Sequence, residues 1–262
     1  MKISIHMTTL IAAGDSFTWG NDLPDCDQTN ASKLSWAAIT AQQLGYDYKC
    51  IAVPGCSNQA IERNTVNAVE LMSDIVVAVM WTYPHRLEVK LNQQLQEERY
   101  FTISGWHGVS VEEKFKHWGN LNEGQILFIK KQHEEYQKIG IPDISKVLTE
   151  YLHDDHYYIE MLRSQIMLRY FLESRNIPYL FLPASDNAIL DRLKKDDPYI
   201  QTQKRISQTA NWLTNPNRGF VEWALINDYK TGTTNHPMQA ACKDYAEKYV
   251  VPAIKSKMTF YA

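Results

Sequence analysis

The sequence is poor in the features that mark several classes of protein. Its 262 residues include only four cysteines, and none forms the CxxC pair typical of structural zinc sites. The cysteines are also too few and too dispersed for a disulfide scaffold; two disulfides remain possible, but free thiols are the expected state. No run of Lys and Arg stands out and the formal net charge is -3, so nucleic acid is not an expected partner.

Long apolar segments are missing too. No apolar stretch reaches the about 18 residues of a membrane-spanning helix, so no membrane span is expected. The N-terminal apolar patch is interrupted by His6, Thr8 and Thr9, and it lacks the length and cleavage site of a signal peptide. We therefore expect a first strand here, and a cytoplasmic or otherwise non-secreted protein. No internal repeat or low-complexity linker divides the chain.

What the sequence does contain is an alternation of strand and helix patterns. Strands are expected at residues 8–13, 47–53, 74–81 and 178–183. Helices are expected at residues 33–44, 58–72, 156–175 and 237–254. Ser57 is a plausible N-cap, and Pro237 suits the first position of the last helix. The alternation predicts an α/β protein: a three-layer α/β/α sandwich around a parallel sheet of about five strands.

The stretch from about residue 84 to 155 breaks this rhythm. It is polar, rich in Gln and Glu, and dotted with aromatic residues. A segment of this length between regular elements is usually functional or separately structured. We expect a single domain, residues 1–262, with an insertion here that is either a lid on the catalytic face or an accessory, partner-binding segment.

A polar turn follows the first predicted strand directly: Gly14-Asp15-Ser16-Phe17-Thr18. In a parallel sheet, ligands bind beyond the carboxyl ends of the strands, which is where Ser16 falls. Gly14 allows a sharp turn, and the Ser16 amide is placed to face a developing oxyanion. Taken alone, the segment fits a simple helix cap equally well.

A serine hydroxyl needs a base to act as a nucleophile. Of the eight histidines, His236 is in the most suggestive setting, because a polar loop at residues 231–235 precedes it and a helix start follows it. This places the imidazole near the same edge of the sheet. The two segments together predict Ser16 as the nucleophile and His236 as its base.

These segments resemble the signature blocks of the GDSL/SGNH hydrolase family. The turn at residues 14–18 is similar to the first block, residues 53–58 to the second, and residues 235–237 to the last. The resemblance spans most of the chain in the right order, apart from residues 84–155. It implies a flavodoxin-like strand order, and ester hydrolysis through an acyl-enzyme on Ser16. It also implies an oxyanion hole that includes the amides of Ser16 and Gly55, and no metal or organic cofactor.

Two positions depart from the family pattern. Tyr83, next to Thr82, stands where the third block has an asparagine that donates to the oxyanion; either hydroxyl is a possible substitute. Thr233 stands where the family has an aspartate that orients the histidine. Asp228 is the nearest replacement, and a Ser–His dyad is the alternative. Since losing one oxyanion donor lowers rates about 100- to 1000-fold, a weak or inactive glycan-binding or structural protein on this fold is the competing hypothesis.

The substrate-binding candidates are Asp15, Asn58, Trp81 and Arg86. Arg86 suits an anionic substrate group, although a surface salt bridge is the simpler role. An aromatic wall for a sugar ring is a further hypothesis, weighed against core packing; its members are Trp19, Trp81, Trp106 and Tyr83.

The expected substrate is a small-molecule or carbohydrate ester with a short acyl group, such as acetyl on a sugar. The insertion is not an apolar helix, which argues against long-chain lipids.

Residues 153–156, His-Asp-Asp-His, have metal-capable side chains. No further clustered ligand accompanies them, so no metal site is expected. Nothing in the sequence indicates an oligomeric state.

Overall fold

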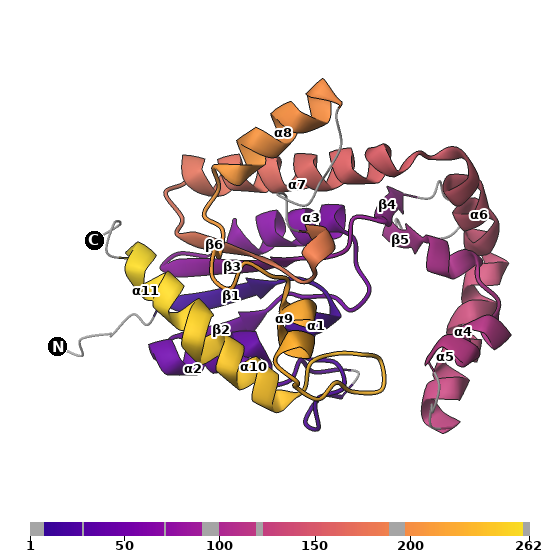
Figure 1. Cartoon of the computed structure of the whole chain (residues 1–262), viewed down its shortest axis with the longest axis horizontal. Coiled ribbons are helices and arrows are strands. Elements are labelled where there is room, and N and C mark those ends of the chain that lie inside the picture. The colour runs from indigo at the N-terminus through magenta and orange to yellow at the C-terminus, as the bar shows by residue number, and fades with distance from the viewer. Residues whose placement is uncertain are drawn as a thin grey trace.

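A parallel sheet covered by helices on both faces forms the centre of the computed structural model (Figure 1). The structure describes residues 8–27, 29–70, 72–90, 100–118, 123–188 and 197–258. The sheet has the strand order β2-β1-β3-β6. Its strands are β1 (Thr9–Ala13), β2 (Asp47–Cys50), β3 (Ile75–Trp81) and β6 (Tyr179–Pro183). The predicted α/β class and parallel sheet are confirmed.

Within the described residues this sheet has four strands, one fewer than predicted. The place of a fifth is taken by a short segment whose Trp212 forms an isolated parallel bridge with Phe181. The Phe181 amide donates to the Asn211 carbonyl at 2.8 Å, and the Leu213 amide donates to the Phe181 carbonyl at 2.8 Å. The pairing does not extend further, and Pro216, which has no N–H to donate, follows shortly after.

Side chains of β3 point alternately into two cores, as the pleat of a strand requires. Val76, Ala78 and Met80 pack with α2 (Trp36–Leu44) and with the last helices of the chain. The other residues of β3, such as Val77, pack with α3 and α7. Every residue of β3 is buried, which explains its continuous apolar sequence.

The helices fall into two layers and a few shorter pieces. The layer beside the second core contains α3 (Asn58–Val69) and α7 (Asp154–Ser174). The layer beside the first core contains α2, α9, α10 and α11. The remaining bounds are α1 (Ser16–Trp19), α8 (Pro198–Gln208), α9 (Phe220–Ile226), α10 (Gln239–Tyr245), the π-helical η4 (Ala246–Val250), α11 (Val251–Met258) and the short η2 (Asp186–Ala188).

The helices begin and end within a few residues of their predicted bounds. The helix expected at 33–44 begins at Trp36, because Ser35 is its N-cap and accepts from the Ala38 amide at 3.3 Å. Ser57 caps α3 as predicted, at 3.2 Å from the Ala60 amide. The last helix begins at Gln239 rather than at residue 237, because Pro237 is engaged in an isolated bridge with Thr231. All four cysteines are free thiols.

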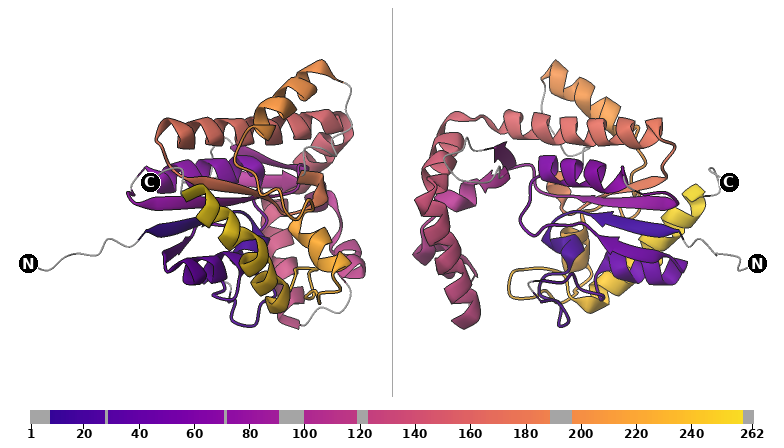
Figure 2. Two further views of the ribbon diagram at one scale, coloured as in Figure 1. Left: turned by 60° about the vertical axis from the view of Figure 1, so that its left-hand side comes forward. Right: turned by 180° about the vertical axis from the view of Figure 1, so that it is seen from behind.

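The segment between β3 and α7 forms an arm beside the covered sheet (Figure 2). The arm consists of β4 (Arg86–Lys90), β5 (Tyr100–Ser104), η1 (Gly105–Gly108), α4 (Val111–Trp118), α5 (Glu123–Lys138) and α6 (Ile141–Tyr151). Its two strands pair antiparallel in a sheet of their own. The expected insertion at 84–155 also includes residues 91–99 and 119–122, which lie outside the described residues.

Candidate active site

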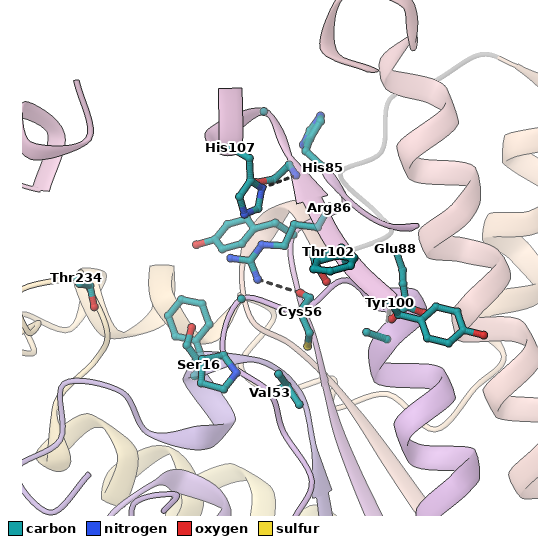
Figure 3. Close-up of a pocket in the computed structure, with 18 of the residues that line it drawn as sticks. Ser16, Val53, Cys56, His85, Arg86, Glu88, Tyr100, Thr102, His107 and Thr234 are labelled. Carbon is teal, nitrogen blue, oxygen red and sulfur yellow. Dashed lines mark hydrogen bonds between the residues drawn. The ribbon is translucent and has the colours of Figure 1, made fainter. Parts of the chain in front are cut away.

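The carboxyl edge of the sheet brings together side chains from separate parts of the sequence. Ser16 follows β1, Gly55 follows β2 and Tyr83 follows β3, while His236 lies in the loop before α10. All four line one cavity of about 1010 Å³. Figure 3 shows this cavity with Ser16 labelled in its wall. The edge therefore gathers both residues of the expected Ser–His pair, as the position of ligand sites in parallel sheets leads one to expect.

The serine turn is fixed by the residues around it. Asp15 caps the short helix α1, and its Oδ1 accepts from the Phe17 amide at 3.1 Å. Gly14 is needed because a Cβ at this position would overlap the side chain of Thr18. The sequence left open whether this segment caps a helix or places a serine at a ligand site. It does both, since Asp15 caps α1 and the Ser16 side chain in the first turn of α1 lines the cavity.

Ser16 and His236 are in hydrogen-bond contact. The Ser16 Oγ lies 2.7 Å from the His236 Nε2. The Phe17 ring packs on the imidazole with 4.6 Å between ring centroids, which restrains the histidine. Ser16 is 7% and His236 is 8% exposed, so bulk water competes little for this hydrogen bond.

The carboxylate at the other imidazole nitrogen belongs to Asp22, which corrects the expectation for Asp228. The Asp22 Oδ2 lies 3.3 Å from the His236 Nδ1. Asp228 is exposed and adopts a left-handed conformation (φ 58°) just after α9. The chain turns there at the end of a helix, so closeness to His236 in sequence does not bring the Asp228 carboxylate to the imidazole.

Thr234 lies between the histidine and the aspartate. Its Oγ1 is 2.7 Å from the His236 Nδ1 and donates to the Asp22 Oδ2 at 2.7 Å. Its backbone amide also donates to the Asp22 Oδ2 at 2.8 Å. Gly232 allows the loop to come this close, because a Cβ there would overlap the Asp22 side chain.

The hydrogens of this group can be assigned by counting donors. An ionised Asp22 carboxylate has no hydrogen, so the single Thr234 hydroxyl hydrogen must point to it. The Thr234 oxygen then accepts from the His236 Nδ1, which must carry the ring hydrogen. The Nε2 is left with a free lone pair facing the Ser16 hydroxyl, which is the arrangement a general base requires.

The charge state of Asp22 fits this assignment. Burial raises the pKa of the Asp22 carboxyl, but hydrogen bonds from His236 and Thr234 outweigh it and leave the pKa below its ordinary value. The carboxylate is therefore ionised at neutral pH and can stabilise an imidazolium that forms at His236.

Sequence reasoning missed Asp22 because its contact with His236 spans 214 positions. The family pattern directed attention to the residues just before the histidine, whereas Asp22 comes shortly after the nucleophile. The sequence gives only an indirect indication of this contact. A polar loop that contains a glycine, Gly232, can approach another side chain closely, but nothing in the sequence says which one.

Asp15 and Arg86 form an ion pair at the site, with Asp15 buried and Arg86 partly exposed. The Asp15 carboxylate is fully buried, and its Oδ2 accepts from the Arg86 guanidinium at 2.8 Å and from the Thr82 hydroxyl at 2.5 Å. The same Arg86 nitrogen lies 3.2 Å from the Cys56 carbonyl (Figure 3). Asp15 thus has no contact surface for a substrate, and Arg86 neutralises Asp15 instead of standing free for an anionic group.

Two other expected substrate contacts are part of the framework. The Asn58 side chain accepts from the Thr82 amide at 3.0 Å and donates to the Thr82 and Tyr83 carbonyls at 3.3 and 3.2 Å. It therefore joins the loops after β2 and β3. Trp81 is fully buried in the second core, with its ring edge-on to Phe181 at 5.2 Å between centroids, because its strand position points it toward α3 and α7.

The expected oxyanion donors differ in what they are free to do. Within the part of the chain that the structure describes, no protein acceptor takes the amide hydrogen of Ser16 or of Gly55. The Thr82 hydroxyl is fully buried and committed to Asp15. Burial raises the pKa of the Tyr83 phenol to about 12, so this cavity-lining hydroxyl keeps its hydrogen and remains a possible donor.

The hypotheses of an aromatic wall and a metal site have limited support in the structure. Of the proposed aromatic residues, Tyr83 lines the cavity, while the side chain of Trp106 lies outside what the structure describes. His153 caps α7 by accepting from the Asp155 amide at 3.3 Å. Among the described residues, no three His, Cys, Asp or Glu side chains form a group suited to a metal ion.

No described helix has the length and apolarity to span a bilayer.

Comparisons with known proteins give structural neighbours only. No protein-family profile matches the chain, and no curated protein sequence matches it. The crystal structure of TesA is 13% identical over 95% of this chain and 99% of its own, with a TM-score of 0.48. A member of the lipolytic protein G-D-S-L family from Veillonella parvula DSM 2008 is 12% identical over 92% and 95% of the two chains, with a TM-score of 0.43.

A third similar structure is Est2A, an acetyl xylan esterase from the rumen bacterium Butyrivibrio proteoclasticus. It is 11% identical, with 96% of this chain and 64% of that chain covered and a TM-score of 0.45.

Proposed function

We propose that this chain is a serine-dependent ester hydrolase. Ser16 attacks the ester carbonyl while the His236 Nε2 takes its proton, and the imidazolium is stabilised by Asp22. The amides of Ser16 and Gly55 hold the oxyanion, with the Tyr83 hydroxyl as a further donor. His236 then gives the proton to the leaving alcohol, and water hydrolyses the acyl-enzyme. The observation that carries the proposal is the 2.7 Å contact between the Ser16 Oγ and the His236 Nε2, with Asp22 behind it.

A glycan-binding or structural protein without catalysis remains the second candidate function, because the third block lacks its amide donor. The geometry favours the enzyme for a specific reason. A binding protein has no use for a carboxylate and a hydroxyl that together set the tautomer of a histidine facing a serine. In addition, the Ser16 and Gly55 amides have no acceptor among the described residues, whereas an oxyanion would satisfy both.

The substrate we propose is an ester with a short acyl group on a neutral, polar alcohol, such as acetyl on a sugar. The cations in the cavity wall are already paired, Arg63 with Glu88 at 2.7 Å and Arg86 with Asp15 at 2.8 Å. An anionic substrate would therefore find no free positive charge among these residues. The cavity volume, about 1010 Å³, is large enough for an alcohol of sugar size or larger.

The test of the proposed function is hydrolysis of p-nitrophenyl acetate by the wild type and by Ser16→Ala. We expect turnover in the wild type and its loss, by about a thousand-fold or more, in the variant. A fluorophosphonate probe should add its mass to the wild type and not to Ser16→Ala. Turnover or labelling that persists in Ser16→Ala would assign the nucleophile elsewhere, and a wild type that shows neither would favour the binding-protein alternative.

A further inference from the structure

The cavity has a second wall, opposite Ser16, that belongs to the arm. Figure 3 shows His107, Thr102 and Tyr100 across the cavity from Ser16. We call four of the lining residues the arm wall; they are Ser104, His107, Gln132 and Tyr136. They come from β5, η1 and α5, and the wall is anchored to α6, since the Ser145 hydroxyl donates to the Ser104 carbonyl at 2.7 Å.

His107 is held as a neutral ring, with one N–H that no described residue accepts. The Ser104 amide donates to its Nδ1 at 3.0 Å, so this nitrogen carries no hydrogen and the Nε2 must carry it. The Tyr136 ring stands edge-on to the imidazole with 5.1 Å between centroids, which fixes its plane. Burial and the nearby Lys114 cation lower the pKa of His107 to about 4, so the ring stays uncharged at neutral pH.

The rest of the arm wall offers donors as well. The Gln132 amide donates to the Tyr136 hydroxyl at 3.3 Å, which leaves the hydroxyl hydrogen of Tyr136 free for another acceptor. Burial raises the pKa of Tyr136, so that hydrogen is retained. Donors without charge bind acceptors without charge best, because an anion would have to give up its hydration shell. The four residues of the arm wall carry no positive charge, and Lys114 is buried and does not line the cavity.

We propose that the arm wall is the subsite for the alcohol half of the ester, with the His107 Nε2–H as its central donor. The group it fits is neutral and rich in hydrogen-bond acceptors, such as the ring and hydroxyl oxygens of a sugar. The subsite rests on the proposed hydrolase function, because it faces the serine whose acyl-enzyme that alcohol would leave. The arm is then the part of the chain that selects the substrate.

The experiment compares two acetate esters and two substitutions at one position. Acetylated methyl xyloside carries ring and hydroxyl oxygens, whereas cyclohexyl acetate has a ring of the same size without them. His107→Phe keeps a flat ring but removes the donor. His107→Gln keeps both functions, since its amide oxygen can accept from Ser104 and its amide nitrogen can donate into the cavity.

We expect His107→Phe to raise KM for the xyloside by about 3- to 10-fold, the effect of one neutral hydrogen bond, with kcat little changed. KM for cyclohexyl acetate should stay within about two-fold, and His107→Gln should recover most of the loss for the xyloside. Thermal unfolding of both variants checks that the arm remains folded.

Two results would overturn the subsite. One is an unchanged xyloside KM in His107→Phe, and the other is an equal rise for both esters, which would mean that packing alone is affected. Failure of the hydrolase proposal gives a different pattern: neither ester is turned over by the wild type. In that case the subsite is still tested by calorimetry of the xyloside binding to Ser16→Ala and to Ser16→Ala with His107→Phe, where equal affinities would reject it.

Discussion

At the scale of single residues, the hydroxyl of Thr234 determines which nitrogen of His236 carries the proton. Thr234→Val keeps the shape of the side chain and removes the hydroxyl that joins the Nδ1 to Asp22. We expect kcat to fall by about 10- to 100-fold, the effect of losing a hydrogen bond to a charged partner. The measurement is kcat and KM for hydrolysis of p-nitrophenyl acetate.

Two variants separate a hydroxyl effect from a disturbance of the loop. Thr234→Ser restores the hydroxyl and should recover most of the activity lost in Thr234→Val. Thr233→Val makes the same chemical change at an exposed neighbour in the same loop and should leave kcat unaltered. If Thr234→Ser is as slow as Thr234→Val, the hydroxyl does not act as described.

The assignment of Asp22 as the acid leads to a second prediction at this scale. Asp22→Asn places an amide nitrogen where a carboxylate oxygen was, so the His236 Nδ1 and Thr234 lose their ionised acceptor. In a serine protease, the same change of the triad aspartate lowers turnover about ten-thousand-fold, and we expect a loss of about 100- to 10,000-fold here. Asp228→Asn is the matched control and should stay within about two-fold of the wild type, since its side chain is exposed.

Steady-state hydrolysis of p-nitrophenyl acetate measures both variants. If Asp22→Asn keeps wild-type kcat while Asp228→Asn does not, the acid assigned from the geometry is incorrect and the sequence-based choice was right. If neither substitution lowers kcat in an active enzyme, the His236 imidazole acts as a base without help from a carboxylate.

At the scale of elements, the one-turn helix η1 carries a pH dependence of stability. His107 keeps a neutral ring in the folded protein until its pKa of about 4, whereas in the unfolded chain it takes a proton near its ordinary value of 6.5. Between these values the unfolded state binds more protons, so the free energy of unfolding must fall as the pH falls from 6.5 toward 4. The loss amounts to at most about 3 kcal/mol.

Glutamine does not titrate, so His107→Gln should make the free energy of unfolding less dependent on pH between 6.5 and 4. Urea unfolding of the wild type and the variant at several pH values measures it. His156→Gln, the same substitution at an exposed histidine, is the matched control. A slope that is the same in wild type and His107→Gln would show that His107 titrates as freely in the folded protein as in the unfolded one.

Elements also show where sequence reasoning succeeds and where it stops. The buried strand β3 and the capped helix α3 follow from local rules, apolar content in one case and Ser57 in the other. The missing fifth strand does not, because whether the segment around Trp212 extends its pairing depends on its neighbours in space. Ser16 and His236 were found because each stands in a recognisable local setting. Asp22, Thr234 and His107 act only through contacts distant in sequence or specific to the fold, so no local pattern marks them.

At the scale of the whole molecule, the arm and the sheet are joined at more than one point. The Ser57 amide donates to the Thr102 hydroxyl at 3.1 Å, which ties the start of α3 to β5. Arg63 of α3 forms a two-point ion pair with Glu88 of β4, at 3.1 and 2.7 Å. These contacts hold the hairpin β4–β5 against α3, so the cavity wall that it provides has a defined position relative to Ser16.

The ion pair between Asp15 and Arg86 has a consequence for how this protein can change over evolutionary time. Arg86 is the first residue of the arm, yet its partner is the residue next to the nucleophile. A shortened chain that lost the arm would leave the fully buried Asp15 carboxylate without its counter-charge, at a cost of about 3–5 kcal/mol. The arm is therefore not a detachable module. The arm and the serine turn depend on each other through this ion pair, so a chain lacking the arm would need a different residue in place of Asp15 or a new cation to face it.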